Sequence, residues 1–310
     1  MNSIEKTIDL LKKKEEPEKQ DIPYAHATDQ EINTQEEENN ISNNMEVKPN
    51  TGTVNNNKLL NIDTMRLKNL GYICPDDMTS QIAEEYRNIK RPLLKNAFGK
   101  GAVPIENGKL IVISSAVPGE GKTFTALNLA ISIAMERNTT ILLVDTDVTN
   151  PSLSRIFQIE NQTGLLDILS DNSVKVENVI HKTNIPNLSV ISAGHNHPFA
   201  AELLASNHMH QFVSQVVDRY SDRIILFDAP PILATSHASL LTQMAGQVML
   251  VVEAGKTLQA TIKEAVSKID SSKVIGMILN KSRNVFKGRY YGYYGSYGHD
   301  SVAKENEFKK

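Results

Sequence analysis

The stretch KLIVISSAVPGEGKT, residues 109–123, decides the fold, and the rest of the chain is arranged around it. Its apolar run from Leu110 to Ile113 is rich in β-branched residues, which is typical of a strand buried on both faces. A segment with helical spacing begins at Thr123. A strand, a glycine-containing turn and a helix are the context of a phosphate-binding loop. The sequence therefore predicts a nucleotide site at this turn.

Each residue type in the turn has a chemical reason to be there. Two glycines let the backbone turn its N–H groups around a phosphate, the lysine supplies a cation, and the threonine hydroxyl can bind Mg²⁺. The N-terminus of the following helix adds a partial positive charge. The usual pattern begins with glycine, whereas this chain has Ala116 at that position. Alanine is small enough to let the backbone approach a phosphate closely, unless the position requires a positive φ. The candidate nucleotide-binding residues are Ala116, Val117, Pro118, Gly119, Glu120, Gly121, Lys122 and Thr123.

Composition excludes several classes of protein. The chain has 310 residues, 40% of them hydrophobic, and a formal net charge of −3, so it can form a sizeable core but has no overall basic surface for nucleic acid. A single cysteine, Cys74, excludes an intramolecular disulfide framework and fits a reducing compartment. No stretch reaches the roughly 18 apolar residues of a membrane-spanning helix. We therefore expect a cytoplasmic protein without a nucleic-acid partner.

The chain is predicted to have four parts. Residues 1–14 have the spacing of a short amphipathic helix, which could dock on another protein or an anionic membrane, or remain a frayed solvated helix. Residues 15–58 are rich in Glu, Asn, Gln and Thr and predict a disordered linker. Residues 59–287 form the predicted P-loop domain, and residues 288–310 a flexible, tyrosine-rich tail.

Buried strands and helices alternate through the predicted domain. Residues 82–97 indicate a charged helix that Pro92 interrupts or kinks, and a helix with an apolar face follows the phosphate loop. This alternation predicts an α/β fold of the P-loop NTPase type, with a mostly parallel sheet and helices on both faces. Further buried strands are expected at 140–144, 188–191, 224–227, 248–252 and 274–279.

Three carboxylates follow the ends of two predicted strands. Asp145 and Asp147 end the strand after the loop helix, and Asp228 ends a later one. Ligands of parallel sheets bind at the carboxyl ends of the strands, so these acids are expected beside the loop. With Thr123, the first and third could hold Mg²⁺ on a nucleotide. Asp147 and Lys122 are the candidate catalytic residues, since a carboxylate near the γ-phosphate can accept a hydroxyl proton while the lysine offsets phosphoryl charge. The alternative is that these acids form turns or cap helices.

A cluster of tyrosines near the C-terminus supplies a candidate nucleophile. Glycines between them disfavour a stable helix, and the stretch has no continuous apolar face. Alone, it could be a segment that stacks on RNA or a low-complexity end. Joined to a nucleotide site, it suggests autophosphorylation on tyrosine. The candidate acceptors are Tyr290, Tyr291, Tyr293, Tyr294 and Tyr297.

These motifs occur in the order found in one known family. The phosphate loop, the stretch ILLVDTD at 141–147, the run ending DAPP at 228–231 and the tyrosine cluster all match. From about residue 60 the chain resembles the bacterial tyrosine kinases (BY-kinases) associated with exopolysaccharide production. Residues 3–6 and 84–94 are similar to the soluble, exosortase-associated tyrosine autokinases. The resemblance implies an ATP- and Mg²⁺-dependent, non-specific protein-tyrosine kinase that phosphorylates its own tail and regulates exopolysaccharide synthesis or export.

The resemblance also implies partners. In this family a Glu-x-x-Arg-x-x-Arg motif mediates oligomerisation, and Glu84, Arg87 and Lys90 occupy its positions here, with Arg91 one step beyond. A lysine at position 90 cannot make the bidentate contact of an arginine guanidinium. The alternative to an oligomerisation motif is that these residues form an ordinary solvated helix face. Further implied partners are a membrane-bound activator of the polysaccharide co-polymerase or chain-length-determinant type, as a separate chain, and a tyrosine phosphatase. Through the activator, the protein is expected at the periphery of the inner membrane.

Two departures from the family pattern and one alternative function remain. The family commonly has an arginine before Pro151, where this chain has Thr149 and Asn150, and often an aspartate where His237 stands. The alternative is a ParA/MinD-like switch ATPase without protein kinase activity. Those relatives carry a signature lysine after the first loop position, where this chain has Val117, and they lack a tyrosine cluster. Both observations favour the kinase.

Overall fold

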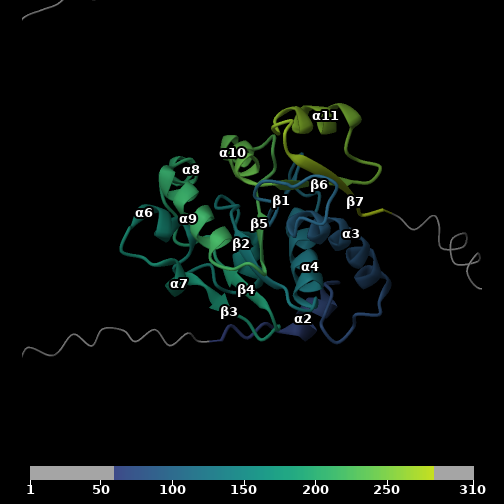
Figure 1. Cartoon of the computed structure of the whole chain (residues 1–310), viewed down its shortest axis with the longest axis horizontal. Helices are drawn as coiled ribbons and strands as arrows, with labels where there is room; N and C mark the ends of the chain where they lie inside the picture. Colours follow the sequence, from purple (N-terminus) through teal and green to yellow (C-terminus); the bar gives the residue numbers. More distant parts are fainter. Residues whose placement is uncertain (1–58, 283–310) are drawn as a thin grey trace, which may run out of the picture. The chain divides into compact units, whose positions relative to one another are not determined.

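A seven-stranded sheet forms the centre of the protein in the computed structural model, which describes residues 59–282 (Figure 1). The strand order is β3-β4-β2-β5-β1-β6-β7. Every neighbouring pair is parallel except the antiparallel pair β3–β4. The predicted α/β class with a mostly parallel sheet is confirmed. The strands are β1 (Leu110–Ser115), β2 (Thr140–Asp145), β3 (His181–Lys182), β4 (Leu188–Ile191), β5 (Arg223–Asp228), β6 (Gln247–Glu253) and β7 (Val274–Asn280).

Helices cover both faces of the sheet (Figure 1), and successive side chains of its central strands enter different cores. On β1, Leu110 and Val112 belong to one apolar cluster, whereas Ile111 and Ile113 belong to the other. The second cluster includes α3 (Gln81–Ala97) and α4 (Lys122–Ala134). The first includes α9 (Asn207–Asp218), α10 (Ser236–Met244) and α11 (Gln259–Ser267). The shorter helices are α2 (Thr64–Asn69), α5 (Ser152–Ile156), α6 (Leu165–Ser170), α7 (Val176–Val179) and α8 (Ala200–Leu204).

The register of the central strands brings the predicted acids to one edge of the sheet. In the β2–β5 pair, Asp145 lies opposite Asp228, and in the β1–β5 pair, Ile113 lies opposite Asp228. β1 therefore runs into its loop beside the two strand ends that carry carboxylates. Because the strands are parallel, their carboxyl ends form a single ligand-binding edge.

The structure differs locally from the expected interruption at Pro92, and it adds one strand that was not expected. α3 continues through Pro92, which is exposed, because the buried side chains of Tyr86, Leu93 and Ala97 hold the helix against the core on either side of it. Strand β3 has two residues, too few for a periodic pattern to indicate it.

Several predicted segments lie outside the described residues. These are the helix at 1–14, the linker at 15–58 and the tail at 288–310. Within residues 59–282, no helix combines the length and apolar character that crossing a bilayer requires.

Candidate functional site

The phosphate loop connects β1 to α4, and its conformation explains where glycine is and is not required. Gly119 and Gly121 have φ values of 86° and 97°, a region that residues with a Cβ rarely adopt. Gly121 is also the N-cap of α4. Ala116 is buried and is not among the described residues with positive φ, so alanine can replace the first glycine of the pattern without backbone strain.

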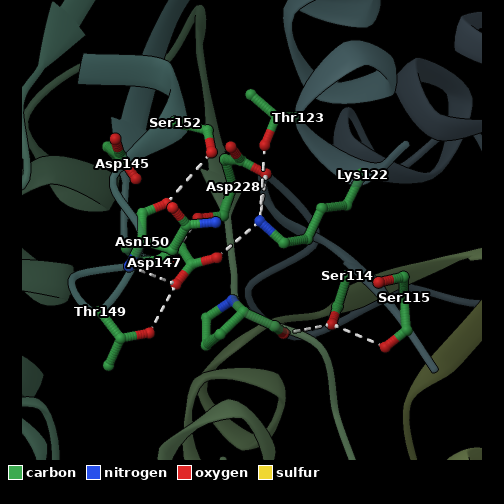
Figure 2. A network of polar contacts seen from close by, with 12 residues as sticks. Ser114, Ser115, Lys122, Thr123, Asp145, Asp147, Thr149, Asn150, Ser152 and Asp228 are labelled. Atoms are coloured by element: carbon green, nitrogen blue, oxygen red, sulfur yellow. Dashed lines mark hydrogen bonds and ion pairs between the residues drawn. The ribbon is translucent and has the colours of Figure 1, made fainter. Parts of the chain in front are cut away.

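Lys122 lies among the three predicted acids (Figure 2). Its Nζ is 2.6 Å from Asp147 Oδ2 and 4.0 Å from Asp228 Oδ1. Burial alone would lower the pKa of Lys122, but the charges of Asp228 and Asp147 and the hydrogen bond to Asp147 raise it above its ordinary value. The ammonium group is therefore charged at neutral pH and lies where it can meet a phosphate.

Asp145 and Asp228 are buried carboxylates with oxygens that lack a hydrogen-bond partner among the described residues. Asp145 Oδ2 accepts hydrogen bonds from the N–H and the hydroxyl of Ser154, both at 2.8 Å. Its Oδ1 and both oxygens of Asp228 have no hydrogen-bond partner among the described residues. Burial and the charge of Asp228 raise the pKa of Asp145 to about 7, and burial raises that of Asp228 to about 6. Unpartnered, buried oxygens of this kind are suited to a cation.

The acids do not converge into a complete metal cage. Across residues 59–282, no group of three or more His, Cys, Asp or Glu side chains is placed to hold a metal ion. Mg²⁺ on a nucleotide normally needs only one or two carboxylates beside phosphate oxygens and water, and Thr123, Asp145 and Asp228 can supply such ligands.

Asp147 is fixed by donors on both of its oxygens. Oδ2 pairs with Lys122, while Oδ1 accepts from Thr149 Oγ1 at 3.0 Å and from the N–H of Asn150 at 3.2 Å (Figure 2). The threonine at 149, which departs from the family pattern, thus orients the candidate base. Sequence patterns gave no sign of this contact, which depends on the turn after β2.

A cavity of about 410 Å³ opens beside the loop, a volume in the range of small-molecule sites. On one side the rings of Tyr72 and Phe124 lie 4.9 Å apart between their centroids. Five of the eight predicted loop residues line this cavity together with Asp147: Pro118, Gly119, Gly121, Lys122 and Thr123.

The side chain of Glu120 has a structural role inside the loop, while its backbone N–H remains part of the predicted phosphate site. Its side chain is only 1% exposed and does not line the cavity. The carboxylate accepts from the N–H of Val117 at 2.8 Å and from the hydroxyl of Thr257. Glu120 therefore holds the loop closed on itself and against the segment after β6.

The predicted oligomerisation motif on α3 is divided between surface and core. Glu84 and Arg87 pair with each other, and Arg87 also donates to the carbonyl of Met78 at 2.8 Å. Lys90 is only 3% exposed. Its Nζ donates to the carbonyl of Ser132 at 2.6 Å and pairs with Glu136 at 2.8 Å. The expectation that Lys90 contacts a second chain is therefore corrected: this lysine joins α3 to α4, and of the two neighbouring cations only Arg91 is exposed.

We predict that Lys90→Ala destabilises the fold by about 1–3 kcal/mol, because it leaves the buried carbonyl of Ser132 without its donor. Arg91→Ala, a change of similar size at an exposed position, should alter the free energy of unfolding by less than about 0.5 kcal/mol. Urea denaturation measures both. Unchanged stability of the Lys90 variant, combined with a smaller oligomer in light scattering, would restore this lysine to an interface.

The predicted tyrosine acceptors lie outside the described residues. The last described residues before them contact the phosphate loop. β7 ends at Asn280, whose Nδ2 donates to the carbonyl of Glu120 at 2.8 Å, and Lys281 Nζ donates to the carbonyl of Gly119 at 2.6 Å. No sequence pattern indicated these contacts, which join residues about 160 positions apart.

The loop, its lysine and the acids at the edge of a parallel sheet define a P-loop nucleotide-binding protein. Residues 108–276 match the family AAA_31, described as an AAA domain. This match covers most of the sheet and all eight residues of the phosphate loop. The chain therefore contains an ATP-binding AAA domain.

Comparison with known proteins identifies the family to which this domain belongs. The chain is 37% identical over 191 residues to tyrosine-protein kinase YwqD of Bacillus subtilis (strain 168), covering 61% of this chain and 78% of that protein. It is 33% identical over 194 residues to tyrosine-protein kinase CpsD of Streptococcus pneumoniae, covering 61% and 84%. The chain belongs to the bacterial tyrosine-protein kinase family.

One solved structure and one further relative are also similar to this chain. The crystal structure of the chimerical protein CapA2B2 matches with a TM-score of 0.58 and 28% identity, over 67% of this chain and 88% of that one. The succinoglycan biosynthesis transport protein ExoP of Rhizobium meliloti (strain 1021) is 27% identical over 260 residues, which cover 79% of this chain and 32% of that protein.

Proposed function

We propose that this protein is an ATP- and Mg²⁺-dependent tyrosine autokinase whose acceptors are the tyrosines between residues 290 and 297. One observation carries the proposal: at the mouth of the phosphate loop, the charged Lys122 lies within ion-pair distance of Asp147 and Asp228. This arrangement suits transfer of a phosphoryl group to a hydroxyl whose proton Asp147 receives. β7 ends at Asn280, ten residues before the first of these tyrosines in the sequence.

The proposed reaction uses the residues in separate roles. ATP binds in the cavity, and Lys122 exchanges its contact with Asp147 for the phosphates. Mg²⁺, held by Thr123 with Asp145 and Asp228, would neutralise phosphate charge. The tyrosine oxygen forms a bond to the γ-phosphorus, the bond from that phosphorus to the bridging oxygen breaks, and ADP leaves. The phenolic proton passes to Asp147, which Thr149 and Asn150 orient.

The proposed setting is polysaccharide synthesis or export, and the proposed subtype is the exosortase-associated one. The succinoglycan biosynthesis protein among the relatives supports the setting. A separate membrane-bound activator of the co-polymerase type is proposed as partner, and the similarity to a chimerical protein supports the idea that such kinase domains work beside a second polypeptide. We further propose a homo-oligomer, a tyrosine phosphatase as antagonist, and residues 59–287 as the kinase domain at the periphery of the inner membrane.

Purified protein incubated with ATP and Mg²⁺, alone and with a candidate membrane partner, is predicted to acquire phosphotyrosine. A variant with all five tail tyrosines changed to phenylalanine should lose this signal and bind ATP as tightly as the wild type, because the cavity is built from other residues. Mass spectrometry locates the modified residues. ATP hydrolysis without phosphotyrosine under any condition would instead favour the switch ATPase.

A further inference from the structure

The outer side of the phosphate loop is bonded to the end of β7. Asn280 Nδ2 donates to the carbonyl of Glu120 at 2.8 Å, and Lys281 Nζ donates to the carbonyl of Gly119 at 2.6 Å. Neither donor residue is among the described residues that line the cavity, although Gly119 itself does. The two donors therefore hold the loop from outside the nucleotide site.

These two bonds fix the direction of two peptide units. In a trans peptide the N–H and C=O groups point in opposite directions. When the carbonyl of Gly119 points to Lys281, the N–H of Glu120 points away from Lys281. When the carbonyl of Glu120 points to Asn280, the N–H of Gly121 points away from Asn280. The N–H groups of residues 120 and 121 are thus available on the opposite side, as a phosphate-binding loop requires.

The contact between Asn280 and the loop is also close. A Cβ at Gly121 would lie 2.1 Å from Asn280 Nδ2, a distance that real Cβ atoms do not show. The positive φ of 97° favours glycine at this position, and a Cβ here would also force the Asn280 side chain away from the loop. The asparagine and the loop fit together as one unit.

Lys281 is itself held in place. Its Nζ is 3.0 Å from Glu253 Oε2, and its backbone has a φ of 55°, which is uncommon for lysine. Glu253 also pairs with Lys256 at 3.3 Å, but no contact of Lys256 with a loop carbonyl is present among the described residues. Lys256 and Lys281 therefore share the carboxylate of Glu253, but only Lys281 contacts the loop among the described residues.

We propose that Asn280 and Lys281 are positioning residues for the nucleotide, which hold two loop carbonyls outward so that the N–H groups of residues 120 and 121 face the phosphates. The inference rests on the proposed function, since it needs a nucleotide in the cavity. Without these donors, the loop can rotate its peptide units, and binding must then restore their orientation at a cost in affinity.

The test measures the affinity for a non-hydrolysable ATP analogue with Mg²⁺ by calorimetry. Lys281→Met and Asn280→Ala are each expected to weaken binding roughly 3- to 10-fold. Lys281→Arg, which keeps a donor, should recover most of the affinity lost in Lys281→Met. Lys256→Met, which removes the same charge beside the same carboxylate, should bind as the wild type does. The KM for ATP should rise in the two loss variants while kcat changes little, because positioning acts on binding.

Thermal unfolding without nucleotide separates positioning from a general loss of structure. We expect midpoints within about 2–4 °C of the wild type, which corresponds to at most a small loss of stability. Equal affinity in Lys281→Met, Lys256→Met and the wild type would overturn the inference while leaving the proposed function intact. A wild-type protein that binds no nucleotide would overturn both.

Discussion

Replacing Lys122 with methionine is expected to reduce tyrosine phosphorylation at least about 100- to 1,000-fold, the range seen when a preorganised electrostatic group is removed from an active site. Methionine is close in length to lysine but carries no charge. The phosphoryl group would then develop charge beside Asp147 and Asp228 without the cation that lies 2.6 and 4.0 Å from them. Phosphotyrosine formation with time, at saturating ATP and Mg²⁺, measures the loss.

The same substitution should leave the fold in place. Lys122 lies at the start of α4, whose remaining residues are held by the apolar core, so circular dichroism should match that of the wild type. Lys256→Met is the control for loss of a lysine near the loop, because its side chain is 75% exposed and pairs only with Glu253 among the described residues. Retention of at least half of the wild-type rate in Lys122→Met would contradict the proposed mechanism.

The elements of the site that could be predicted are those encoded by neighbouring residues. The loop from Ala116 to Thr123 has its own pattern, and Asp145 and Asp228 follow recognisable buried strands. A parallel sheet then brings strand ends to one edge, so the meeting of loop and acids followed from topology. This part of the prediction needed no knowledge of side-chain packing.

Other features could not be predicted because they depend on packing between distant segments. Lys90 was placed on an exposed face by its motif, yet the approach of α3 to α4 buries it against Ser132. Glu120 belongs to the loop pattern, but its contact with Thr257 depends on where the segment after β6 lies. Lys281 likewise reaches the loop only because β7 pairs with β6 at the sheet edge.

The buried pair of carboxylates predicts opposite effects of one substitution on stability and activity. Burial and the charge of Asp228 raise the pKa of Asp145 to about 7 in the folded protein, above the ordinary value of 3.8 that it has in the unfolded chain. Between these two values, the folded state binds more protons than the unfolded state, so the free energy of unfolding falls as the pH rises. Above about pH 7 the aspartate is charged in both states, and the full cost of its burial remains.

Asparagine at position 145 should remove this cost. Its carbonyl can accept the two hydrogen bonds from Ser154, and it carries no charge to bury. In the absence of metal and nucleotide, we expect Asp145→Asn to be more stable than the wild type at pH 8 by on the order of 2 kcal/mol, a difference that shrinks toward pH 5. Its kinase activity should fall, because a neutral amide is a poorer ligand for Mg²⁺ than a carboxylate.

Urea denaturation with a chelator at several pH values, together with phosphotyrosine assays, tests both effects. Asp167→Asn is the control, because its expected change in the free energy of unfolding at pH 8 has the opposite sign. Burial alone would raise the pKa of Asp167, but hydrogen bonds from the N–H of Gly164 and from His195 lower it. Its charge therefore stabilises the fold above its unfolded pKa, and the asparagine variant should lose stability at pH 8. If Asp145→Asn were less stable than the wild type at pH 8 and unaffected by pH, the carboxylate would be a structural acceptor for Ser154. A gain in stability with a loss of activity would show that its buried charge is kept for catalysis.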